Sequence, residues 1–206
     1  MMKLLPILFV AACLVGCGQR DEPEGTADTR TRPDNPMPEP SDLAAPGQTP
    51  EGASVQLAPT QGNTAAGSLA VTAAEGSVRL SGAIQGLTPN SEFGFHIHEK
   101  GDCSAPDASS AGAHFNPTSA EHGNPESETH HTGDMMNAKS DDKGVAQVDT
   151  SASGATLHSG QPTDVLGRAV VLHEKADDYT SQPSGNSGSR IACGVITVQP
   201  PPQTAG

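Results

Sequence analysis

From Ser54 onward the sequence is a succession of short runs in which apolar and polar residues alternate. The runs are SVQLA, GSLAVTAAE, GSVRLSGAI, EFGFHIHE, GVAQVDT, VLGRAVVLH and RIACGVITV. Alternation with a period of two places successive side chains on opposite faces of a sheet, so each run predicts a strand. After the N-terminal apolar segment, no stretch of a dozen residues combines a helical period with freedom from glycine and proline. The fold class is therefore predicted to be all-β.

Two long stretches without strand patterning interrupt these runs. One lies between His98 and Gly144, the other between Glu174 and Arg190, and both are rich in Gly, Pro, Ser and Asp. Long connections without secondary structure of their own are uncommon unless they serve a function. We therefore expect a β-sandwich or barrel whose chemistry sits in two long loops.

The run EFGFHIHE carries two histidines in a strand pattern. It places Phe93, Phe95 and Ile97 on one face, and His96 and His98 on the other. Two imidazoles on one face of a strand can converge on a metal, whereas two exposed histidines on a polar face are the alternative. Most of the eight histidines fall in this run and in the loop that follows it, and another ends the run VLGRAVVLH. Such clustering in an acidic chain favours metal ligands.

Residues 1–16 have the form of an export signal. Lys3 precedes an apolar run from Leu4 to Val15, which is too short to span a bilayer. The ending LVGC resembles the lipobox of bacterial lipoproteins, in which the cysteine, here Cys17, is acylated and becomes the mature N-terminus. The alternative is an ordinary cleaved signal followed by a chance cysteine. We expect an exported protein of the cell envelope or periplasm, anchored by lipid to the outer membrane.

The rest of the chain divides by composition. Residues 17–53 are rich in proline, acid and threonine and predict a disordered linker with a reach of ~30 Å, which serves as a spacer. Residues 54–199 contain the strand runs and form the predicted domain. Residues 200–206 are expected to be a flexible tail.

Four cysteines are sorted by these boundaries. Cys13 leaves with the signal and Cys17 takes the lipid, so Cys103 and Cys193 remain. Because exported proteins meet an oxidising compartment, we expect these two to form a disulfide rather than stay as buried free thiols. The net charge of −13 argues against nucleic acid as a partner.

Six blocks of the sequence together resemble one family in their order and spacing. The blocks are GFHIHEKGDC, SAGAHFNP, EHGNP, HTGD, GRAVVLHEKADD and GNSGSRIACGVI. From about Val55 to Val198 the chain is similar to bacterial copper/zinc superoxide dismutases of the exported lipoprotein type. The resemblance implies a Greek-key β-sandwich or barrel with two long functional loops, and copper and zinc as cofactors.

Carried over residue by residue, the resemblance implies two sets of metal ligands that share one histidine. The copper ligands would be His96, His98, His114 and His173. The zinc ligands would be His114, His122, His131 and Asp134. His130 lies one place off the motif and is left out, and His158 lies outside every motif and is expected at the surface. The ligand types agree with the metals, since four imidazoles suit a redox-active copper and three imidazoles with a carboxylate suit zinc.

The resemblance also gives roles to two residues that are not ligands. Asp177 matches an acid that hydrogen-bonds one copper histidine and one zinc histidine, here His96 and His122. The alternative is a solvated acid beside Asp178. Arg190 matches an arginine near copper that attracts and orients superoxide, and the alternative is an exposed arginine at the start of a strand.

The implied reaction is the dismutation of superoxide to dioxygen and hydrogen peroxide. Arg190 would guide the anion, and His114 would deliver a proton. Two alternatives are a copper- and zinc-binding envelope lipoprotein without turnover, and a structural or adhesion module. The implied partners are superoxide and, through Cys17, a membrane, and the chain is expected as a monomer or homodimer. Because loop 180–189 has no charged residue, further steering charges are sought in Lys100, Lys139, Lys143, Arg168 and Lys175.

Overall fold

The computed structural model describes residues 52–199 of the 206-residue chain. The export signal, Cys17, nearly all of the linker and the tail 200–206 lie outside the described residues. Among those described, no helix is long and apolar enough to cross a membrane.

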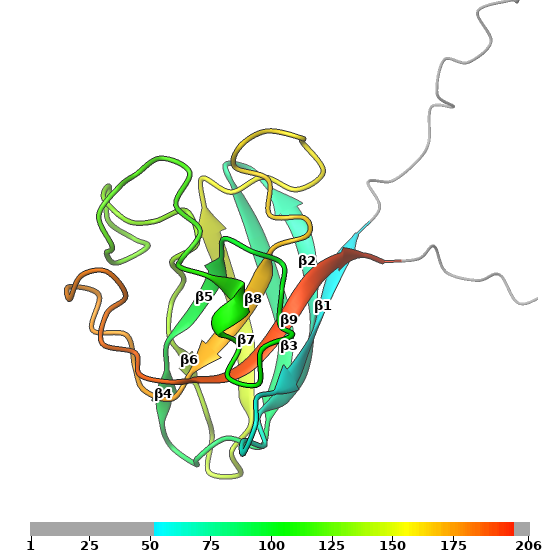
Figure 1. The fold of residues 1–206 in the computed structure, drawn as a ribbon, viewed down its shortest axis with the longest axis vertical. Helices are drawn as coiled ribbons and strands as arrows, with labels where there is room; N and C mark the ends of the chain where they lie inside the picture. The colour runs from blue at the N-terminus through cyan, green and yellow to red at the C-terminus, as the bar shows by residue number, and fades with distance from the viewer. Residues whose placement is uncertain (1–51, 200–206) are drawn as a thin grey trace, which may run out of the picture. The chain divides into compact units, whose positions relative to one another are not determined.

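The described chain consists of nine strands and one 3-10 helix (Figure 1). In chain order they are β1 (Ala53–Pro59), β2 (Ala66–Ala74), β3 (Ser77–Gln85), β4 (Glu92–Phe93), β5 (Phe95–His98), η1 (Ser109–Ala111), β6 (Ala138–Lys139), β7 (Ala146–Ser153), β8 (Ala169–His173) and β9 (Arg190–Val198). Every strand pairing in the two sheets is antiparallel.

The strands form a nearly closed barrel. Seven of them make one sheet in the order β5-β8-β9-β1-β2-β3-β7, and β4 pairs with β6. Gly94 alone separates β4 from β5, and a bridge from Ser140 to Ala146 connects the β6 side to β7. The sheet order departs from chain order because β9 returns to lie between β8 and β1. The predicted all-β, Greek-key barrel is therefore confirmed.

The core is built from the inward positions of these strands. It is made mainly of aliphatic residues and phenylalanine, as the alternating runs predict. Its fully buried members include Val55, Leu69, Val71, Leu80, Ile84, Phe95, Ile97, Leu172 and Ile196.

Both faces of β5 are buried, and this places the histidines. Phe95 and Ile97 enter the barrel core, whereas His96 and His98 face outward and are still nearly inaccessible. They are covered by the first long loop, which lies along β5. Two main-chain hydrogen bonds of 2.8 Å attach this loop to the strand: the amide of Phe115 donates to the carbonyl of Ile97, and the amide of Ile97 donates to the carbonyl of Gly133. Figure 1 shows this loop (green) and the loop after β8 (orange) on the same side of the barrel.

Three details differ from the sequence prediction. The run EFGFHIHE is broken at Gly94, where a Cβ would lie 2.7 Å from Ser187 Oγ. The run VLGRAVVLH is a strand only from Ala169 onward. The first long loop is not devoid of secondary structure, since it contains η1 and β6.

The predicted disulfide is present. Cys103 and Cys193 are bonded, with Cα atoms 5.8 Å apart. The bond fastens the start of the first long loop to β9, three residues after Arg190.

Candidate metal centre

The structure brings all seven predicted ligands together in two overlapping groups. In each group, four ligand atoms lie within 4.8 Å of one another, and every residue is buried. Strand β5, the end of β8 and the first long loop supply them. One group consists of His96, His98, His114 and His173, and the other of His114, His122, His131 and Asp134.

The group predicted for zinc is arranged around the carboxylate of Asp134. Its oxygens lie 2.9 Å from His114 Nδ1, 3.0 Å from His122 Nδ1 and 3.4 Å from His131 Nδ1. The amides of His131 and Gly123 donate to Oδ2 at 2.8 and 3.2 Å, which fixes the carboxylate in place. Three Nδ1 atoms and one carboxylate oxygen thus converge, and these are donor types that zinc binds.

The group predicted for copper lies on the other side of His114. Its Nδ1 faces Asp134, whereas its Nε2 points away from that carboxylate. The rings of His114 and His96 are stacked with centroids 3.9 Å apart, and the Nε2 atoms of His98 and His173 are 3.3 Å apart. One imidazole therefore presents a nitrogen to each group, which is the geometry of a bridging ligand.

Buried nitrogens without hydrogen-bond partners show that the residues fit bound metals. Among the described residues these are His96 Nδ1, His114 Nε2, His122 Nδ1 and His131 Nδ1. The last two lie near Asp134 but outside hydrogen-bond geometry. Because buried polar atoms are rarely left unpaired, these nitrogens fit the role of metal ligands.

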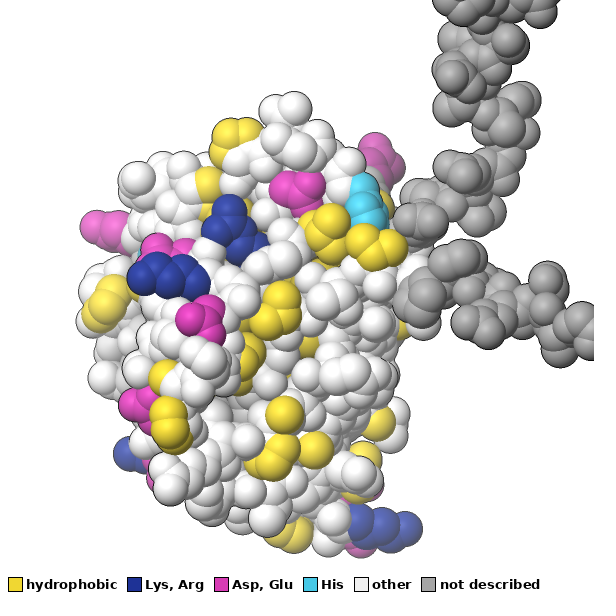
Figure 2. Space-filling view, turned by 45° about the vertical axis from the view of Figure 1, so that its right-hand side comes forward, with side chains coloured by type: hydrophobic (Ala, Val, Ile, Leu, Met, Phe, Trp, Pro, Cys, Tyr) yellow, Lys and Arg dark blue, Asp and Glu magenta, His cyan; other side chains and the backbone are white. Residues whose placement is uncertain are grey.

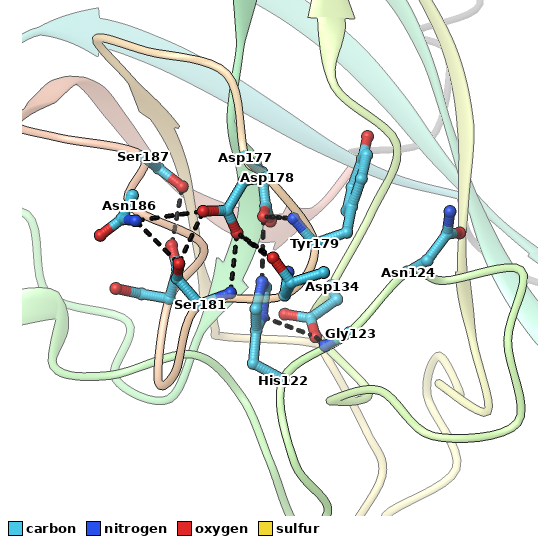
Figure 3. A network of polar contacts seen from close by, with 12 residues as sticks. His122, Gly123, Asn124, Asp134, Asp177, Asp178, Tyr179, Ser181, Asn186 and Ser187 are labelled. Carbon is cyan, nitrogen blue, oxygen red and sulfur yellow. Dashed lines mark hydrogen bonds and ion pairs between the residues drawn. The ribbon is translucent and has the colours of Figure 1, made fainter.

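Acceptors behind the ligands orient their rings. Asp177, which is 3% exposed, lies with its two oxygens 2.6 Å from His96 Nε2 and 3.0 Å from His122 Nε2, and so joins the two groups. Figure 3 shows Asp177 and Asp134 both close to the His122 ring, where they contact different ring nitrogens. His98 and His173 instead use main-chain carbonyls, those of Gly112 and Gly188. Each contact turns the other ring nitrogen toward the metal position.

The electrostatics of the centre differ from one ligand to the next. Burial lowers the pKa of His114 to about 4 and that of His173 to about 3, so both stay neutral. Burial acts in the same direction on His122, but its contact with Asp134 and its hydrogen bond with Asp177 outweigh burial and raise its pKa to about 9. In turn, burial opposes the charge on Asp134, yet contacts with three histidines hold its pKa well below the usual range.

Arg190 lies in the wall of an open cavity of about 660 Å³ that reaches the copper group. The cavity is lined also by His98, His114 and His173. The guanidinium donates from Nη1 to the carbonyl of Ala108 and from Nη2 to that of Gly112, each at 2.5 Å. Among the described residues, Arg190 is the one Lys or Arg in the cavity lining.

None of the other cations considered for steering lines this cavity. Lys139 pairs with Glu92 at 2.9 Å, and Arg168 stacks on Phe115 at 4.4 Å and donates to the carbonyl of Glu99. His130 is in neither ligand group, and His158 is exposed, as predicted.

Sequence reasoning missed Glu99 and Gln182. Glu99 lines the same cavity as Arg190 and follows the two strand histidines directly, a position that could have indicated it. The side-chain amide of Gln182 contacts the main chain of His122, and no sequence signal pointed to it.

Comparison with known proteins identifies relatives over most of the chain. Residues 65–196 match the family described as copper/zinc superoxide dismutase. The superoxide dismutase-like protein YojM of Bacillus subtilis is 35% identical over 197 residues, which is 94% of each chain. The copper/zinc superoxide dismutase 2 of Aquifex aeolicus is 47% identical over 115 residues, which is 54% of this chain and 67% of the relative.

Solved structures agree with these relatives. The clock protein EA4 is 41% identical and superposes with a TM-score of 0.65, covering 74% of this chain and 98% of its own. A superoxide dismutase-like protein of Bacillus subtilis, in a variant with a proline replaced by histidine, is 38% identical with a TM-score of 0.64, covering 70% and 97%. The chain belongs to the copper/zinc superoxide dismutase family, whose metals are copper and zinc.

Proposed function

We propose that this chain dismutates superoxide, 2 O₂⁻ + 2 H⁺ → O₂ + H₂O₂. In this proposal His96, His98, His114 and His173 hold copper, and His114, His122, His131 and Asp134 hold zinc. The observation that carries it is His114, which presents one nitrogen to each buried ligand group beside a cavity that Arg190 lines. A site built only to store metal needs no open cavity with a cation in its wall.

When bound, copper supplies one-electron chemistry and zinc holds the shared imidazole in place. Arg190 keeps its charge at neutral pH, and its two main-chain contacts leave further N–H groups free to bind a small anion. His114 Nε2 is the atom that holds and delivers a proton, because Nδ1 faces the zinc group. Asp177 keeps His96 and His122 oriented throughout.

The experiment is metal analysis and a superoxide assay on the purified chain. We expect one copper and one zinc per chain, and turnover that is lost when copper is removed. Stoichiometric binding of both metals without turnover would favour the alternative, a non-catalytic metal-binding envelope lipoprotein. The name of the Bacillus subtilis relative YojM, which aligns over 94% of this chain, supports this alternative, because it says only superoxide dismutase-like.

We further propose that the protein acts in the cell envelope, anchored by lipid on Cys17. The supporting observation is the pattern of the first residues, which resembles a lipobox and precedes a long polar linker. The surface argues against nucleic acid as a partner. On the face drawn in Figure 2, basic side chains stand singly or beside acidic ones and form no continuous basic patch.

A further inference from the structure

The second long loop is attached to the main chain of a zinc-group ligand. The side-chain amide of Gln182 forms a reciprocal pair with His122: Oε1 accepts from the His122 amide at 3.0 Å, and Nε2 donates to the His122 carbonyl at 2.9 Å. The side-chain amide thus forms the pair of main-chain hydrogen bonds that a neighbouring strand would otherwise form. His122 lies in a part of the first long loop that has no strand, so this pair holds its backbone from outside.

The loop that carries Gln182 is itself closed by one carboxylate. Asp178 accepts hydrogen bonds at 2.7 to 3.2 Å from amides, hydroxyls and a side-chain amide of its own loop (Figure 3). The donors are Thr180, Ser181 and Asn186. The Asp178 amide also donates to the carbonyl of Gly185 at 3.0 Å. Gln182 therefore projects from a turn with many internal bonds.

The same loop lies directly on the hydrogen bond that orients the His122 ring. Gly185 has a φ of +63°, and a Cβ there would lie 1.7 Å from Asp177 Oδ1 and 2.8 Å from His122 Nε2. Only glycine fits a position with this backbone and this clearance. The ring of His122 and its main chain are consequently held by one loop.

We propose that Gln182 is a positioning residue for His122, and that Asp178 acts through it by fixing the loop. The inference rests on the zinc assignment of the proposed function. Contacts behind a metal ligand change metal affinity by about 10- to 100-fold when they are removed. Gln182 should accordingly strengthen zinc binding, although it belongs to neither ligand group and does not line the cavity.

The test is zinc affinity of the full chain, measured by competition with a chromogenic chelator. Gln182→Ala should bind zinc about 10- to 100-fold more weakly than the parent. The matched control is Gln161→Ala, because Gln161 is exposed on another loop, and it should bind zinc as the parent does. Copper retention should change less than about threefold, since His122 is not in the copper group, whereas general misfolding would lower both.

A double-mutant cycle tests the route from Asp178. Asp178→Ala should weaken zinc binding in the parent, but add little in the Gln182→Ala background, because the two act through one contact. Parental zinc affinity in Gln182→Ala, or fully additive effects in the cycle, would overturn the inference and leave the proposed function standing. A parent chain that binds no zinc would overturn the metal assignment and this inference with it.

Discussion

His98 and Arg190 share one hydrogen-bond acceptor, the main-chain carbonyl of Gly112. His98 Nδ1 contacts this oxygen at 2.9 Å, and Arg190 Nη2 donates to it at 2.5 Å. A ligand of the copper group and the cation in the cavity wall are thereby fixed relative to each other by one peptide unit. The disulfide holds the same loop to β9, so the position of Arg190 depends on covalent and hydrogen-bonded support together.

Removal of the disulfide should cost both stability and activity. The bond closes a loop of 90 residues. In the chain-entropy model, the double variant Cys103→Ser/Cys193→Ser should have a free energy of unfolding lower by about 4 to 5 kcal/mol. Urea unfolding of the metal-free protein measures this. We also expect kcat/KM to fall, because the released loop supplies the carbonyls that hold Arg190. An unchanged urea midpoint would contradict the stabilising role.

The shared ligand should be distinguishable from a ligand of zinc alone. His114→Ala should reduce both copper and zinc content, because the imidazole faces both groups. Asp134→Asn should mainly weaken zinc binding, since its carboxylate belongs to one group. Metal analysis of the two variants, prepared in parallel, measures the difference. Equal loss of copper in both would disprove the bridging role.

Glu99 is a negative charge in the lining of the cavity that superoxide must enter. Glu99→Gln keeps an acceptor for the Ala113 amide, which Oε1 now binds at 3.3 Å, but removes the charge. Two unit charges about 8 Å apart in a water-like dielectric interact with ~0.5 kcal/mol. Removal of a repulsion of this size should raise kcat/KM at low salt about twofold. The gain should fade as salt is added.

The control for this change is Glu75→Gln, which removes an exposed charge from the turn between β2 and β3, outside the cavity. It should leave kcat/KM nearly unchanged. If both variants gain equally, the effect reflects net charge rather than the position of Glu99.

Sequence patterns predicted the parts of this protein that are encoded locally. The strand runs follow from a period of two, and the ligand set was implied by the resemblance of six short sequence blocks to one family. Gly94 shows the limit of such patterns, because Ser187, which leaves no room for a Cβ there, lies on a remote loop.

Contacts made by the main chain left no signature in the sequence. The carbonyl of Gly112 organises the cavity, and Gln182 recognises the backbone of His122, so neither role required a particular partner side chain. The positions of charges also could not be predicted from the sequence, which offers five further cations as candidates for steering. None of the five lines the cavity.

Lipid attachment is tested by a change outside the described residues. If Cys17 is acylated, the parent should partition into the detergent phase, and Cys17→Ser should move to the aqueous phase with its activity retained. Cys13→Ser is the matched control, because Cys13 belongs to the predicted signal and is removed with it; this variant should remain anchored. Detergent partitioning of Cys17→Ser like that of the parent would rule out the lipobox interpretation.

Arg190 should supply the local positive field that the rest of the domain lacks. Residues 54–206 carry 16 acidic and 7 basic side chains, so the domain repels an anion at long range. Arg190→Lys should retain part of the activity, because a charge remains but the fork to Ala108 and Gly112 is lost. Arg190→Ala should retain less and Arg190→Glu least. Copper and zinc content should not change, since Arg190 is in neither ligand group.

The decisive measurement is the dependence of kcat/KM on ionic strength. Salt screens charges over ~10 Å at 0.1 M, so the parent should slow as salt rises, whereas Arg190→Glu should speed up as its repulsion is screened. The control is Arg79→Ala, which removes an arginine that pairs with Asp149 across strands β3 and β7 and does not line the cavity. Its kcat/KM should depend on ionic strength as that of the parent does. If Arg190→Glu, with both metals bound, matched the parent at low salt, Arg190 would not guide superoxide. The positive field would then have to come from cations outside the cavity lining.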